Sequence, residues 1–133
     1  MTKILNDIPL LTFNSLYNLL REEKRTKKLQ KLPELFYEAL EKFLIEKKDE
    51  IKQLKKDNVD MQKLKKERYI FYNSKKISNE LLNLRFMKIS NITIKNKIFE
   101  DEILSEDNIL EREKEFYVSV QKGVSKMLKL IQI

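Results

Sequence analysis

Apolar residues recur at a helical period through the first half of the chain. Spacings of three and four positions predict a first helix over Phe13–Arg25. A second helix is expected to begin at or just before Pro33, because a proline in the first helical turn loses no hydrogen bond. That helix should end near Asp57–Asn58. Its apolar face consists of Phe36, Ala39, Leu40, Phe43 and Leu44.

A long third pattern begins at Asp60, a residue type that caps helix N-termini well. We expect this helix to reach about Asn91, with Asn73–Ser74 as a candidate break. The β-branched residues in Ser90–Phe99 weaken a helix, so we interpret that stretch as a helix end and a loop.

A last helix is expected to start at Ser105 and to run to about Leu130. One further short turn is expected over Ile98–Leu104. Gly123 lies inside the last helix, where glycine costs about 1 kcal/mol relative to alanine. Close approach of a neighbouring helix is one reason for a glycine at this position.

These patterns predict an all-α fold, a bundle of four or five helices forming a single domain over residues 1–133. The third and last helices are too long to be covered within one chain of this size, so we expect another chain to meet their apolar residues. The candidates for that interface are Leu81, Leu84, Ile89, Phe116, Val120 and Val124.

Composition excludes several classes of function. The chain has neither cysteine nor histidine, which excludes disulfides, catalytic triads and the commonest zinc sites. It lacks a glycine-rich phosphate loop, and its carboxylate pairs fit solvated helix surfaces. We therefore predict no enzyme activity, no catalytic residue, no metal and no cofactor. With neither a signal peptide nor 18 consecutive apolar residues, we expect a cytoplasmic protein that does not span a membrane.

The formal net charge of +7 suits nucleic acid or an acidic partner. Candidate phosphate contacts lie in a lysine stripe late in the second helix, and Tyr69, Phe71 and Tyr72 follow on the third. Aromatic residues at helical spacing are more often core, and the lysines also fit an ordinary solvated surface, so both readings stay open. The stripe residues are Lys48, Lys52, Lys55 and Lys56.

One turn carries more than a generic helical signal. The run Leu29-Gln30-Lys31-Leu32-Pro33 joins the first two helices, and Phe36-Tyr37 follows it. Leu29 and Leu32 are expected to fill the gap between these helices, with Phe36 in the core and Gln30 and Tyr37 hydrogen-bonded at the edge.

This turn, Leu20-Arg21-Glu22 before it, and Leu84-Arg85-Phe86-Met87-Lys88-Ile89 in the long helix resemble the archaeal GINS family. The similarity is to the subunit class in which the helical domain comes first. Interface or motif candidates carried by this resemblance include Arg21, Arg85 and Lys88. About 25 residues carry it specifically.

The resemblance implies a non-catalytic scaffold subunit in a DNA replication complex. Its partners would be a GINS subunit or further copies of itself as a dimer or tetramer, the MCM helicase, and a RecJ-type protein. The family's small C-terminal β domain is expected to be absent from this sequence, either naturally or by truncation. The alternative is a basic helical nucleic-acid-binding module or a coiled-coil adaptor.

Overall fold

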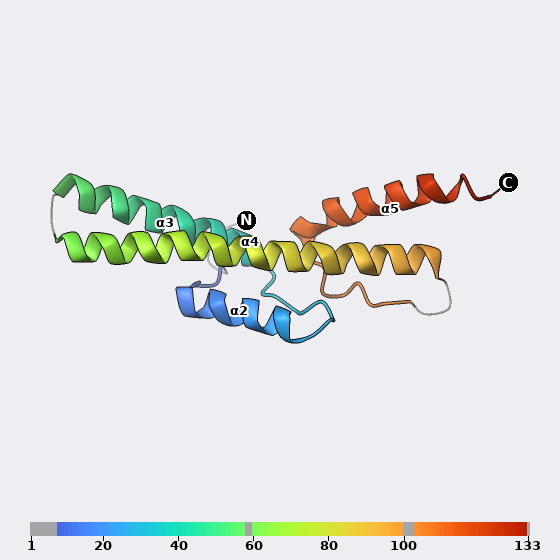
Figure 1. Ribbon diagram of the computed structural model, residues 1–133, viewed down its shortest axis with the longest axis horizontal. Helices are drawn as coiled ribbons and strands as arrows, with labels where there is room; N and C mark the ends of the chain where they lie inside the picture. The colour runs from blue at the N-terminus through green and yellow to red at the C-terminus, as the bar shows by residue number, and fades with distance from the viewer. Residues whose placement is uncertain (1–7, 58–59, 100–102, 133) are drawn as a thin grey trace. The chain divides into compact units, whose positions relative to one another are not determined.

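The computed structural model describes residues 8–57, 60–99 and 103–132, and every regular element among them is helical (Figure 1). The predicted all-α class is therefore confirmed for the described part of the chain. The elements are α2 (Phe13–Arg25), α3 (Phe36–Asp57), α4 (Met61–Ile98), the 3-10 turn η1 (Glu111–Glu113) and α5 (Lys114–Leu128).

The described residues fall into two compact units. The first contains the residues up to Arg21 together with Leu35–Leu81, and the second contains Glu22–Glu34 and the residues from Leu82 onward. Helices α2 and α4 each contribute to both units, so the chain is described unit by unit.

In the first unit, α3 and the first half of α4 form a hairpin (Figure 1). The Lys47 ammonium lies 3.1 Å from the Glu67 carboxylate across this hairpin. Asp60 caps α4 as predicted, since its carboxylate accepts the Gln62 N–H at 3.1 Å. The core of the unit includes Leu16, Leu20, Phe36, Ala39, Leu40, Phe43, Ile51, Leu64, Ile77 and Leu81.

Three expected boundaries prove wrong. Helix α3 begins at Phe36, not at Pro33, and the carbonyl of Leu35 accepts its first helical hydrogen bond, from Ala39. Pro33 thus lies in the connecting segment, before a turn at residues 34–35, where a proline restricts the backbone without costing a helical bond. Helix α4 shows no break at Asn73–Ser74 and continues past Asn91 to Ile98.

Burial explains why α4 continues through β-branched residues. Ile89, Ile92 and Thr93 are buried, and the Thr93 hydroxyl donates to the carbonyl of Ile89 at 2.7 Å. Tertiary packing therefore outweighs the weak helical propensity of this stretch.

The last helix also begins later than expected. The side chain of Asn96 hydrogen-bonds both the N–H and the carbonyl of Leu104, which holds that residue in an extended segment. Ser105 accepts the Asp107 N–H in a turn instead of capping a helix, and α5 starts only at Lys114. No helix occupies the described residues 103 and 104, and residues 100–102 of the expected turn lie outside the described part.

The expected close approach at Gly123 is wrong for the described residues. A β-carbon placed on Gly123 would have no neighbour within 4 Å.

Candidate protein-interaction surface

The second unit is built around Arg85, whose side chain is fully buried on α4. Its Nε–H and one Nη2–H donate to the two carboxylate oxygens of Glu113, at 2.7 and 2.8 Å. Nη1 donates to Glu23 at 3.0 Å and to the carbonyl of Gln30 at 2.7 Å, and Nη2 also reaches the carbonyl of Asn108 at 3.0 Å. All five guanidinium N–H groups therefore have an acceptor.

The two carboxylates of this network are equally well satisfied. Glu23 also accepts from the Lys88 ammonium at 2.6 Å and from the N–H of Gln30 at 3.1 Å. Burial alone would lower the pKa of Arg85, but its hydrogen bond with Glu113 and the charges of both carboxylates raise that pKa above its ordinary value. Two cations thus face two anions, and the network has no net charge.

Lys88 fixes the end of α2. Its ammonium donates to the backbone carbonyls of Glu23, Thr26 and Lys28, at 2.5, 2.8 and 3.1 Å. The last carbonyls of a helix lack intrahelical hydrogen-bond donors and carry a partial negative charge. A lysine ammonium at this position supplies hydrogen-bond donors and a compensating positive charge.

A buried apolar cluster lies beside the network and is formed by Leu29, Ile89, Ile92 and Ile109. Leu29 therefore packs against α4, and not in a gap between the first two helices as the sequence suggested. Asn108 fixes this position by donating to the carbonyl of Leu29 at 2.9 Å.

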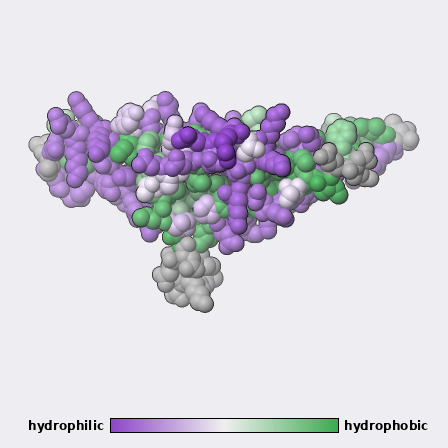
Figure 2. All heavy atoms as spheres, turned by 90° about the horizontal axis from the view of Figure 1, so that it is seen from below, coloured by the Kyte–Doolittle hydropathy of each residue, from purple (hydrophilic) through white to green (hydrophobic). Residues whose placement is uncertain are grey.

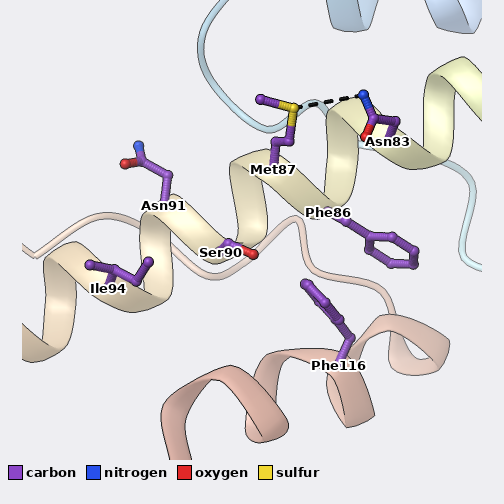
Figure 3. A pocket seen from close by; sticks show the side chains of 7 residues that line it. All are labelled: Asn83, Phe86, Met87, Ser90, Asn91, Ile94 and Phe116. Atoms are coloured by element: carbon purple, nitrogen blue, oxygen red, sulfur yellow. Dashed lines mark hydrogen bonds between the residues drawn. The ribbon is translucent and has the colours of Figure 1, made fainter. Parts of the chain in front are cut away.

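One face of the second unit, between α4 and α5, remains open and apolar. Its first hollow, of about 380 Å³, lies between residues 83–94 of α4 and Phe116 of α5 (Figure 3). There the rings of Phe86 and Phe116 face each other with centroids 4.6 Å apart. Ile94 lines this hollow and also the next one.

The second hollow, of about 460 Å³, has no charged residue in its lining. We call the two hollows together the α4–α5 face. The lining of the second hollow is Ile94, Ile98, Gly123, Val124, Met127, Leu128, Leu130 and Ile131.

The face is contiguous and solvent-accessible. Met87 and Met127 are each 63% exposed, and Ile131 is 76% exposed. Hydrophobic residues also gather at the right end of the molecule in Figure 2, where the chain ends. Single exposed apolar residues are ordinary, whereas a contiguous apolar patch is typical of an interaction site.

The interface and motif candidates separate into three groups. The fully or largely buried ones stabilise the fold and are Leu29, Leu32, Phe36, Leu81, Arg85 and Ile89. The partly buried ones are Gln30, Tyr37, Leu84, Lys88, Phe116, Val120 and Val124, and Phe116 and Val124 line the α4–α5 face. Arg21 and Pro33 are exposed, and the Arg21 guanidinium lies 6.0 Å from the centre of the Tyr17 ring.

The predicted lysine stripe is exposed to solvent in the first unit. Its residues are Lys48, Lys52, Lys55 and Lys56.

The rings of Tyr69 and Tyr72 are 67% and 62% exposed, so the interpretation of these two rings as core is wrong. The Lys76 ammonium lies 5.2 Å from the centre of the Tyr72 ring.

Within residues 8–57, 60–99 and 103–132, no group of three or more acidic, histidine or cysteine side chains could hold a metal ion. No described helix is both long and apolar enough to cross a membrane.

The partners of Arg85 are not evident from the sequence. Glu23 and Glu113 lie 62 and 28 positions away along the chain. The available signal was that Arg85 lies at helical spacing from the apolar residues Leu81 and Ile89, since a buried guanidinium requires carboxylates.

No protein-family model matches the chain, and comparisons with curated proteins and with solved structures find no similar protein.

Proposed function

We propose that the chain is a non-catalytic scaffold subunit that assembles with another helical chain, or with its own copies, through the α4–α5 face. The observation that carries this proposal is the open apolar lining of that face, which reaches from Phe86 to Ile131. Covering such a surface removes apolar area from water, and this is the dominant favourable term in most protein association.

The Arg85 network supports the same proposal. It joins the end of α2, the connecting segment, α4 and η1 through buried hydrogen bonds. A unit held together in this way presents its surface without reorganising, which lowers the cost of binding.

The resemblance of the turn and of the Arg85 segment to archaeal GINS subunits specifies the class of complex. On that basis the chain supports the MCM helicase during DNA replication, with a GINS partner subunit or further copies of itself as its neighbours. A RecJ-type protein is a further partner that the resemblance suggests.

Sedimentation of the purified chain, alone and mixed with a GINS partner subunit of the same organism, tests the assembly. We expect a dimer or a larger species in at least one of the two samples. A strictly monomeric chain in both would overturn the proposal. Binding of the assembled species to purified MCM helicase then tests the replication role separately.

A second candidate function is binding of single-stranded nucleic acid, favoured by the exposed rings of Tyr69 and Tyr72 beside lysines of α4. Exposed aromatic rings can stack on bases, and lysines can neutralise phosphates. This function predicts affinity for an oligonucleotide that falls steeply with salt and is lost in a Tyr69→Ala/Tyr72→Ala variant. Binding unchanged by that variant would contradict the assignment to these rings.

A further inference from the structure

A third cavity of the second unit differs in chemistry from the α4–α5 face. Its volume is about 480 Å³, within the range of about 300–1,000 Å³ that is typical of ligand sites. We call it the basic cavity, because its lining includes Lys27 and Lys28 from the segment after α2 and Lys95 from α4.

The three lysines are available to a ligand. Within the described residues, no acidic side chain lines the basic cavity, and none pairs with the ammonium of Lys27, Lys28 or Lys95. The fourth lysine of the lining, Lys88, is already bound to Glu23 and to backbone carbonyls. No described acidic side chain therefore neutralises the positive charge of the other three.

The rest of the lining is apolar or is able to hydrogen-bond. Leu29 and Ile92 are buried members of the core cluster, and Leu104 packs against it, so they form a firm apolar wall. Asn91 and Ser105 add an amide and a hydroxyl. The Asn91 side chain points away from α5 in Figure 3, and Asn91 lines both the basic cavity and the first hollow of the α4–α5 face.

We propose that the basic cavity binds a segment of a partner protein in which acidic and apolar side chains are interspersed. Carboxylates of that segment would meet the three lysines, its apolar side chains would contact the wall, and its backbone would hydrogen-bond Asn91 and Ser105. Such charge complementarity between surfaces steers association and sets specificity.

Two features favour such a segment over a phosphate or a nucleic acid. The lining has no arginine, the residue best suited to bidentate phosphate contacts, and no aromatic ring on which a base could stack.

Octapeptides with four Asp or Glu and four Leu, Ile or Val positions, synthesised as a fluorescent library, provide the probe. The test variant is Lys27→Glu/Lys28→Glu/Lys95→Glu. The matched control is Lys48→Glu/Lys52→Glu/Lys55→Glu, which lowers the net charge equally but alters exposed lysines of the first unit. Circular dichroism checks that both variants keep their helix content.

We expect the tightest peptides to bind the cavity variant about tenfold or more weakly than the unmodified chain, while the control changes their affinity less than about twofold. Lys95→Glu alone and Ile103→Ser, at a residue that is 76% exposed in the lining, should each weaken binding measurably.

Four results would overturn this proposal: no peptide binds, the control variant loses as much affinity as the cavity variant, peptides with serine at the apolar positions bind equally well, or pyrophosphate or a single-stranded oligonucleotide binds through the same three lysines. None of these substitutions lies on the α4–α5 face. Sedimentation of the same variants therefore tests the assembly proposal independently.

Discussion

Arg85 and Glu113 form a two-pronged ion pair, with N–O distances of 2.7 and 2.8 Å, in which both side chains are at most 1% exposed. Breaking a buried pair by removing one partner leaves the other charge without compensation and typically costs about 3–5 kcal/mol. We expect Arg85→Met to lower the free energy of unfolding by this amount, because it leaves both Glu113 and Glu23 buried without their guanidinium.

Urea denaturation at low protein concentration measures this change. Arg85→Lys should recover only part of the stability, since an ammonium cannot reproduce the planar fork. Arg68→Met is the matched control on an exposed arginine of α4 and should change stability by less than about 0.5 kcal/mol. A loss below about 1 kcal/mol for Arg85→Met would show that the network contributes little to folding.

Lys88 makes a separate contribution at the end of α2. Replacing it with methionine removes the donor for the carbonyl of Thr26 and one of the two donors for the carbonyl of Lys28, and we expect a loss of about 1–3 kcal/mol of stability. Amide hydrogen exchange should accelerate mainly at Gln30, whose N–H donates to the carboxylate that Lys88 also binds. The exposed Lys97→Met is the control, and equal exchange at Gln30 in both variants would contradict this role.

The sequence predicted elements that are determined locally. The bounds of α2 and the cap at Asp60 follow from residue spacing and from a single side chain, and both are confirmed. Where α4 ends and where α5 begins depend on burial of Ile92 and on the Asn96 side-chain bonds to Leu104, which are tertiary contacts made outside the helical repeat. Periodicity carries no information on such contacts, so these boundaries were wrong.

The candidate site, too, depends on contacts that the periodicity of the sequence does not reveal. Apolar residues on the second half of α4 and on the last helix indicated a surface for another chain, and the structure leaves an open apolar face there. The basic cavity brings Lys27 and Lys28 together with Lys95, far apart in the sequence. Linear spacing cannot reveal such a combination.

Tyr117 provides a test at high pH. Burial, followed by its hydrogen bond to the Glu106 carboxylate, raises the pKa of Tyr117 from 10.0 to about 12. Because the folded pKa lies above the unfolded one, the stabilisation is complete below about pH 10 and is lost as the pH rises toward 12. The difference in tyrosinate absorbance between the unmodified chain and Tyr117→Phe should show this late titration. A midpoint at 10 would contradict it.

Gly123 allows a stabilising substitution. A β-carbon there meets no described atom within 4 Å, and glycine inside a helix costs about 0.5–1 kcal/mol relative to alanine. Gly123→Ala should therefore raise the free energy of unfolding of the dissociated chain by this amount, as measured by urea denaturation at low concentration. A destabilised variant would show that a close neighbour exists at this position after all.

Charge on the α4–α5 face should prevent assembly without unfolding the chain. Ile98 and Met127 are 45% and 63% exposed and line the second hollow, so Ile98→Asp/Met127→Asp changes little inside the unit. Burying either carboxylate against an apolar partner would require desolvation without a compensating charge. We expect sedimentation to show that this variant associates about tenfold or more weakly than the unmodified chain.

Ile45→Asp, at a 52% exposed position of α3, is the matched control and should assemble normally. If both variants assemble as the unmodified chain does, the partner binds elsewhere, and the apolar lining of this face does not mediate assembly.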